Sequence, residues 1–403
     1  MTTPGRSPAS RAYRLAVPLS LASAGLGLGR ELLVLHKLGL SSANDLLQFY
    51  LSVTYTISLL GDAIRLGVLN LLQGGGLSPA VASAALVAVA SGVPLTLWYA
   101  HSGPGSNAWL LAAAGLAGIL NLLTVVLLVH RQRAGRFLPA HVITVLPNVM
   151  IFAGVALAML GPEERFLATV VVLFLAAPVL QLILLALLGT PAAEAGHRSV
   201  VAEAVASGVG QIGLHGLGAV GAQAGQVLIR TTLAARAPGM LTLFVLLSRA
   251  VDTVRAILLD TFIGARLAEW SAGRGRLPAL LDPGRLAPLA LAVTVLATGG
   301  AALAGAGATE AVVVAPWLVA VLLPGAWLAF LQRAGYFHLN ARATPRALIL
   351  RLGVLDAGLA VALAVLTVVA GPGPLVLVWL FYVVRIALQI GMMRRLVTAG
   401  VRD

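Results

Sequence analysis

Long blocks of apolar residues alternate with short segments rich in polar residues, glycine or proline along almost the whole chain. The blocks have the length of about 20 residues that an α-helix needs to cross a bilayer. They are continuous rather than alternating, which disfavours the strands of a membrane barrel. The pattern predicts twelve spanning helices, over residues 15–37, 46–72, 79–100, 108–129, 138–160, 167–189, 204–233, 240–265, 286–306, 311–332, 347–370 and 375–393.

The composition supports this interpretation. Apolar residues make up 59% of the 403 residues and charged residues only 10%, and the mean hydropathy is +0.97. These values exclude a soluble globular domain, a disordered chain and a collagen-like fibre, and they favour an all-α polytopic membrane protein. Cysteine is absent, which excludes disulfides, thiolate metal sites and cysteine nucleophiles.

The net charge of +13 comes mainly from arginines that lie between the apolar blocks. They gather in alternate connections, at 131–136, 266–285 and 333–346, and at both ends, whereas the intervening connections carry little arginine apart from Arg236. Cytoplasmic loops of membrane proteins carry such an excess. We therefore expect both termini in the cytoplasm, explain the basic residues by topology rather than nucleic acid, and interpret the first apolar block as a span instead of a cleaved signal.

A polar connection near the middle divides the predicted spans into two sets of six. Such a division is typical of transporters whose substrate path lies between two lobes. We predict a cytoplasmic tail over 1–14, an N-lobe over 15–189, a cytoplasmic linker over 190–203, a C-lobe over 204–393 and a cytoplasmic tail over 394–403.

Charged residues within the spans are the main functional candidates, because each costs at least ~2.5–3.5 kcal/mol in the bilayer core. They concentrate at the start of each half. One alternative is that they pair only to hold helices together, as the spacing of Asp62 and Arg65 allows, and as we expect for Asp356 and Arg385. The excess of arginine instead favours an anionic ligand such as phosphate. The candidates for substrate binding are Arg30, Arg65, Arg230, Arg249 and Arg255, and the candidate cavity carboxylates are Glu31, Asp45, Asp62, Asp252 and Asp260.

Three stretches resemble the MurJ/MviN-like lipid II flippases and related polysaccharide exporters of the MOP superfamily. They are residues 23–72, 226–267, with Arg249 and Asp252, and 331–346. The sequence departs from the family pattern at Ala24, where the family has a basic residue, and at 57–58, where it has a basic pair. Lipid II flippases of the family also carry two further C-terminal helices beyond the twelve expected here. The first stretch matches the family at Gly27, Arg30, Glu31, Gly39, Asp45 and Asp62.

The resemblance implies a MOP/MATE-like transporter, not an enzyme, that works by alternating access. It implies export of a polyprenyl-pyrophosphate-linked saccharide or peptidoglycan precursor across the bacterial inner membrane. Arg30, Arg249 and Arg255 would hold the pyrophosphate, and the carboxylates would position the arginines or bind a coupling monovalent cation. The membrane potential is the other source of energy, and no metal or organic cofactor is expected. The implied partners are membrane lipids and cell-envelope synthesis proteins.

The sequence leaves three alternatives open. The first is a cation-coupled exporter of small molecules, for which an excess of carboxylates over arginines would be expected. The second is a membrane enzyme acting on lipid-linked sugars, which the very short outer loops argue against. The third is a non-transporting scaffold that kept the fold, which the missing basic positions would suit.

Overall fold

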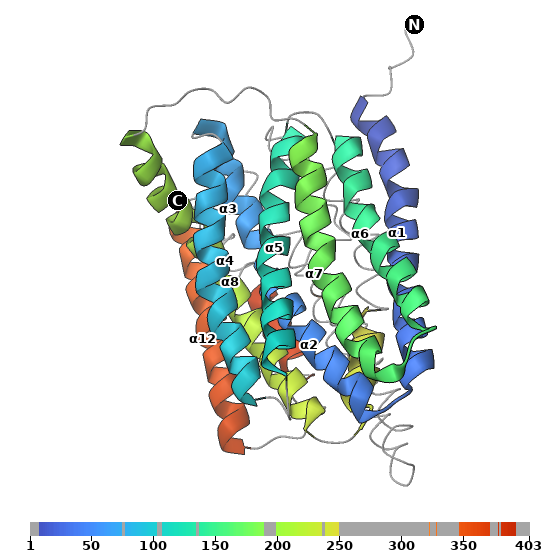
Figure 1. The fold of residues 1–403 in the computed structure, drawn as a ribbon. Helices are drawn as coiled ribbons and strands as arrows, with labels where there is room; N and C mark the ends of the chain where they lie inside the picture. Colours follow the sequence, from blue (N-terminus) through green and yellow to red (C-terminus); the bar gives the residue numbers. More distant parts are fainter. Residues whose placement is uncertain are drawn as a thin grey trace, which may run out of the picture. The chain divides into compact units, whose positions relative to one another are not determined.

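The computed structural model describes residues 8–74, 77–102, 107–133, 137–188, 199–235, 238–249, 346–370 and 380–391, with single positions at 322, 328 and 378. This part of the chain is helical throughout, as expected (Figure 1). A shorter helix, Met240–Arg249, follows α8. The labelled elements are α1 (Pro8–Leu38), α2 (Ser42–Ser58), α3 (Gly61–Gly74), α4 (Leu77–Ser102), α5 (Ala108–Arg133), α6 (Phe137–Ala158), α7 (Glu163–Leu187), α8 (Ser199–Ala234), α12 (Arg346–Ala370) and the π-helix η2 (Leu380–Val384).

Five of the described helices are long and apolar enough to cross a membrane, and the bent helix α8 provides a sixth if its two arms count as one span. The chain is therefore a multi-pass membrane protein. The expected spans over 286–306 and 311–332 lie almost wholly outside the described residues, so the number twelve stays a prediction.

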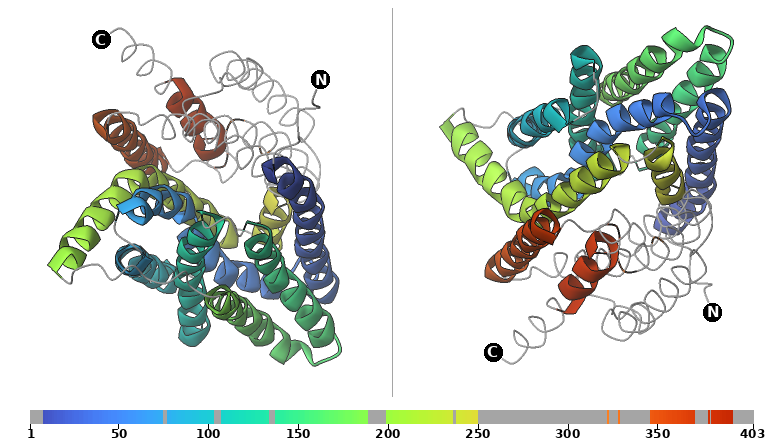
Figure 2. Two further views of the ribbon diagram at one scale, coloured as in Figure 1. Left: turned by 90° about the horizontal axis from the view of Figure 1, so that it is seen from above. Right: turned by 90° about the horizontal axis from the view of Figure 1, so that it is seen from below.

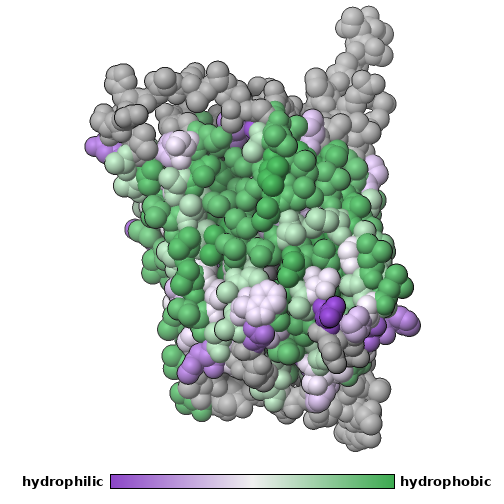
Figure 3. Space-filling view, in the orientation of Figure 1, coloured by the Kyte–Doolittle hydropathy of each residue, from purple (hydrophilic) through white to green (hydrophobic). Residues whose placement is uncertain are grey.

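The chain packs as two compact units. The first unit comprises Pro18–Ala219 and Arg230–Thr242. Within it, α5 packs against α2, α3, α4 and α7, and α6 packs against α7, so that α4, α5, α7 and α6 stand side by side (Figures 1 and 2). Their outer surface is apolar over most of its area (Figure 3), as lipid contact requires.

The predicted span over 46–72 is two helices rather than one. The amide of Leu59 donates to the carbonyl of Thr56 at 3.4 Å, and that of Leu60 to Ile57 at 3.2 Å. Bonds between residues three apart tighten the last turn of a helix, and Gly61 then begins α3. This local break separates α2, which carries the polar residues described below, from α3.

Polar side chains fasten α1 to α6. The hydroxyl of Ser20 lies 3.1 Å from His141 Nε2, and Asn148 Nδ2 donates to Ser23 Oγ at 2.6 Å. At the end of α1, Lys37 Nζ donates to two backbone carbonyls just beyond α6, those at 159 and 161, at 3.2 Å each. These bonds satisfy helix-end carbonyls that would otherwise lack partners.

A further hydrogen bond joins α5 to α7. Arg131 is fully buried, and its Nη2 donates to the carbonyl of Leu185 at 2.9 Å. That carbonyl belongs to the last turn of α7, where backbone acceptors have no partner within the helix. Arg131, expected as a loop residue on the cytoplasmic side, is thus built into the packing of the first unit.

The second unit comprises the described residues 8–17, Val220–Ile229 and the described residues from Leu243 onward. It contains the expected pair between Asp356 on α12 and Arg385, which directly follows η2. Arg385 Nε and Nη2 donate to the two carboxylate oxygens of Asp356, each at 3.0 Å. Both side chains are buried, and this parallel geometry is the strong form of the pairing.

Candidate functional site

A tight turn between α1 and α2 aligns the residues of the candidate site. Gly39 ends α1 with a positive φ of 64°, which glycine adopts without strain. Ser41 then caps α2, and its hydroxyl accepts from the backbone amide of Asn44. Asn44 Nδ2 in turn donates to the carbonyl of Gly39 at 2.8 Å. The end of α1 and the start of α2 are therefore held together by local bonds.

Four polar residues form a stripe along one face of α2. At about 100° per residue, Asp45, Gln48, Ser52 and Tyr55 fall within an arc of about 80°. Asp45, Gln48 and Ser52 are buried and Tyr55 is half-buried. A polar stripe inside a membrane protein faces other protein or water rather than lipid.

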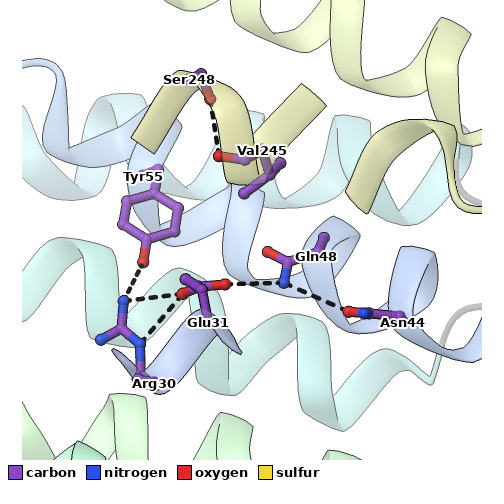
Figure 4. Close-up of polar contacts among 7 residues, drawn as sticks. All are labelled: Arg30, Glu31, Asn44, Gln48, Tyr55, Val245 and Ser248. Atoms are coloured by element: carbon purple, nitrogen blue, oxygen red, sulfur yellow. Dashed lines mark hydrogen bonds and ion pairs between the residues drawn. The ribbon is translucent and has the colours of Figure 1, made fainter. Parts of the chain in front are cut away.

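Arg30 on α1 is the centre of the first cluster. It is 6% exposed, and its Nε and Nη2 both donate to Glu31 Oε1, at 3.1 and 3.0 Å. Nη2 also makes a longer contact of 3.5 Å with the hydroxyl of Tyr55 (Figure 4). The guanidinium carbon lies 4.6 Å from the ring centre of Phe174 on α7, within the range of a cation–π interaction.

The remaining nitrogen of Arg30 carries no bond within the described part of the chain. Both bonds to Glu31 and the contact with Tyr55 use Nε and Nη2, and no hydrogen bond of Nη1 to a described residue is present. Two N–H groups of this guanidinium thus remain for a further acceptor.

Glu31 connects Arg30 to α2. Its second oxygen, Oε2, accepts from Gln48 Nε2 at 3.1 Å, and the same Nε2 makes a longer contact of 3.5 Å with Asn44 Oδ1. The result is a chain of contacts from Arg30 through Glu31 and Gln48 to Asn44 (Figure 4).

Arg230, near the end of α8, brings a second guanidinium to the same stripe. Its Nη1 donates to Ser52 Oγ at 2.6 Å, and its guanidinium carbon lies 5.9 Å from the ring centre of Tyr55. Tyr55 is therefore contacted by two arginines, by Arg30 at its hydroxyl and by Arg230 at its ring. Residues about 175 positions apart in sequence meet here, and both belong to the first unit.

Asp45 accepts hydrogen bonds from the residues at the start of the helix Met240–Arg249. Its Oδ2 accepts from the amide of Gly239 at 2.6 Å, and its Oδ1 accepts from the amide and the hydroxyl of Thr242, at 2.8 and 2.7 Å. A carboxylate at a helix N-terminus satisfies free amides and complements the helix dipole. Gly239 has a positive φ of 86°, which exposes its amide to Asp45.

The other predicted site residues lie elsewhere. Asp62 and Arg65 are half-buried on α3, one turn apart. Arg249 is half-buried and belongs to the second unit. Arg255, Asp252 and Asp260 lie outside the described residues. Among the predicted residues, the structure thus brings Arg30, Glu31 and Arg230 to one stripe, with Asp45 at its start.

Sequence reasoning missed Gln48, Ser52, Tyr55 and Phe174. The predicted site residues were all charged, and these four are neutral. The spacing of the polar positions on α2 could have identified three of them, because they share the face of Asp45. Nothing in the sequence indicates the position of Phe174, which reaches Arg30 only through the packing of α7.

The chemistry of this cluster suits an anion. Among the described residues it combines the guanidinium groups of Arg30 and Arg230 with the one carboxylate of Glu31, and it lies among buried groups where electrostatic interactions are strong. In the described part of the chain, no group of three or more His, Cys, Asp or Glu side chains could hold a metal ion.

No protein-family model matches the chain, and no curated protein matches it by sequence. Solved structures do match. A structure of the lipid II flippase MurJ in an inward closed conformation has a TM-score of 0.63 at 13% identity, over 96% of this chain and 87% of that one. The eukaryotic MATE transporter AtDTX14 has a TM-score of 0.55 at 13% identity, over 97% and 95%.

An outward-facing structure of a multidrug resistance MATE family transporter of the MOP superfamily covers both chains completely, with a TM-score of 0.50 at 15% identity. At such identities the likeness concerns the fold and leaves the substrate undecided. The similar proteins are transporters and flippases, and the chain shares their fold.

Proposed function

We propose that the chain is an alternating-access flippase that moves a polyprenyl-pyrophosphate-linked saccharide across the bacterial inner membrane, with both termini in the cytoplasm. The observation that carries the proposal is the cluster around Tyr55, where Arg30 and Arg230 meet on one polar stripe. The fold shared with MurJ supports it, as does the resemblance of residues 23–72 to that family.

The pyrophosphate would bind at the guanidinium groups. Arginine is always charged and offers several N–H groups in one plane, which suits phosphate oxygens. Arg30 Nη1 has no hydrogen-bond partner among the described residues, and Glu31 and Phe174 hold the rest of the guanidinium in place. A side chain held in this way loses little conformational entropy when it binds a ligand. In the same proposal Arg65, Arg249 and Arg255 are further contacts, and Asp62, Asp252 and Asp260 are carboxylates that position them.

Alternating access requires contacts that close one side and open again. We assign one such contact to Asp45, which joins the start of α2 to the backbone of Gly239 and Thr242. In the proposed topology these residues lie at the outer end of the spans. Release of Asp45 would then accompany opening to the outside, driven by the membrane potential or a coupling monovalent cation.

The second candidate is a cation-coupled exporter of small molecules. The observation that favours it is the similarity to MATE transporters over nearly the whole chain. Among the described residues around Tyr55, two arginines face one carboxylate, Glu31, whereas a cation or a cationic drug would be better served by the opposite balance. The anionic, lipid-linked cargo therefore remains the first proposal.

The test is a flipping assay in liposomes that hold a labelled polyprenyl-pyrophosphate saccharide. We expect wild-type protein to flip it, and Arg30→Gln to lower the rate at least about tenfold because a charge-assisted contact is lost. Arg165→Gln is the matched control, since Arg165 is exposed at the start of α7, and it should flip at the wild-type rate. Full flipping by protein carrying both Arg30→Ala and Arg230→Ala would contradict the proposal.

A further inference from the structure

The side-chain oxygen of Gln48 is a buried acceptor without a donor. Gln48 is 2% exposed, and its Oε1 has no hydrogen-bond partner within the described part of the chain. Buried polar atoms in native proteins are nearly always paired, and an unpaired one lowers stability. An acceptor kept in this condition, next to the Arg30 cluster, calls for an explanation.

The orientation of the Gln48 amide is fixed by its neighbours. Glu31 is held by Arg30 through Oε1, so it is a carboxylate that can only accept. Gln48 must therefore present its Nε2 to Glu31 Oε2, and the reverse orientation would bring two oxygens together. The contact of Nε2 with Asn44 Oδ1 favours the same choice. Oε1 consequently turns away from both residues (Figure 4).

We infer that Gln48 Oε1 accepts a hydrogen bond from a hydroxyl or amide N–H of the saccharide part of the cargo. Gln48 is then a specificity-determining residue beside the arginines. This inference rests on the proposed function, and it assigns a separate part of the same cargo to a separate group of the protein.

The chemistry of Oε1 excludes the other parts of such a cargo. Pyrophosphate oxygens are acceptors and cannot pair with another acceptor. A polyprenyl chain has no hydrogen-bond donor. A coupling cation would need several oxygen ligands, whereas the carboxylate beside Gln48 already receives both Arg30 and the Gln48 amide. Sugar hydroxyls and acetamido N–H groups are the donors that remain.

The hydrogen-bonded series of Arg30, Glu31 and Gln48 would thus present two different groups to the cargo. Arg30 Nη1 offers N–H donors to phosphate, and Gln48 Oε1 offers an acceptor to a sugar, with Glu31 between them. Sites built to hydrogen-bond a polar group discriminate strongly against ligands that lack it, because their own buried group is then left unpaired. The protein would therefore prefer glycosylated lipid over bare polyprenyl pyrophosphate.

The test measures binding to purified protein in nanodiscs. The probes are a polyprenyl-pyrophosphate saccharide, the same lipid with its sugar hydroxyls methylated, and bare polyprenyl pyrophosphate. We expect wild-type protein to bind the first probe about tenfold more tightly than the other two, as one buried hydrogen bond permits. Gln48→Met, which keeps the length of the side chain, should lose this preference while it retains affinity for the bare lipid.

Thr54→Val is the matched control. Thr54 is a buried polar residue of the same helix, but its hydroxyl donates to the carbonyl of Ala114 on α5 at 2.7 Å. It should keep the wild-type preference among the three probes. Thermal unfolding of each variant shows whether it is folded, and the wild-type comparison of free and methylated sugar does not depend on any variant.

The outcomes separate the two proposals. Equal binding of all three probes by wild-type protein, or an unchanged preference in folded Gln48→Met, overturns the role of Gln48 and leaves the proposed pyrophosphate site standing. Failure of wild-type protein to bind either the bare or the glycosylated lipid overturns the proposed function, and with it the inference that rests on it.

Discussion

Individual charges in the first unit are held by specific partners rather than left to solvent. Glu31 is the clearest case, because it receives two nitrogens of Arg30 on one oxygen and the amide of Gln48 on the other. Both charged residues are less than a tenth exposed. Removal of one member of a buried pair leaves an uncompensated charge, which costs more than the pair itself contributes.

Glu31→Ala should therefore destabilise the protein by about 3–5 kcal/mol. The double variant Arg30→Met with Glu31→Met should be less destabilised than Glu31→Ala, since it removes both charges and fills the space. Thermal unfolding in detergent micelles measures the difference. A double variant that unfolds at a lower temperature than Glu31→Ala would show that the pair itself stabilises the fold.

A comparable prediction concerns Asp45 at the start of α2. In Asp45→Asn an amide group would face backbone N–H donors, so at least one of the three bonds to Gly239 and Thr242 is lost, at about 2 kcal/mol. Thr242→Val removes only the hydroxyl bond and should cost about 1 kcal/mol. Equal unfolding temperatures for the two variants would argue against a special role of the carboxylate.

Helices of the first unit approach closely where one of them lacks a side chain. A Cβ atom at Gly118 on α5 would lie 2.8 Å from Ile57 Cβ on α2, which is too short for a contact between carbon atoms. Small residues at such crossings allow membrane helices to pack backbone to backbone. Ile57 lies on the side of α2 opposite the polar stripe, so this crossing leaves the stripe turned away from α5.

The crossing can be tested with two substitutions. Gly118→Ala should destabilise by about 1–3 kcal/mol through overpacking, and Ile57→Ala by about 2–5 kcal/mol through the cavity it creates. Together they should cost less than the sum, because each makes room for the other. Strict additivity of the two shifts in unfolding free energy would mean that the side chains do not meet.

The elements also show what sequence can and cannot predict. Apolar blocks located the helices well, and the pair of Asp356 and Arg385 followed from the need to neutralise charges within spans. The break after Ser58 was not predicted, because the largely apolar sequence on either side of it is typical of one continuous helix. The spacing on α2 places Gln48 and Tyr55 on the face of Asp45, but that this face meets Arg30 depends on tertiary packing.

At the scale of the whole molecule, the proposed orientation in the membrane is directly testable because the chain has no cysteine. Single cysteines can therefore be introduced at exposed positions without a background of native thiols. Ser102 at the end of α4 and Ala202 near the start of α8 are both exposed. In the proposed topology the first lies outside and the second in the cytoplasm.

Ser102→Cys should react with a membrane-impermeant maleimide on intact spheroplasts, and Ala202→Cys only after permeabilisation. The apolar face over α4 and α5 should exclude the reagent because it lies in lipid, so Leu116→Cys should react in neither condition. Labelling of Ala202→Cys on intact cells would reverse the proposed orientation.

The fully buried Arg131 has a consequence for how the protein is made. Its partner, the carbonyl of Leu185, is 54 residues further along the chain, so it does not yet exist when α5 leaves the ribosome. In the proposed topology the arginine would hold this end of its helix in the cytoplasm during that interval. Once α7 has been inserted, the same charge closes the end of that helix. In the proposed topology one residue would therefore contribute to insertion first and to assembly afterwards, in the order in which the chain is translated.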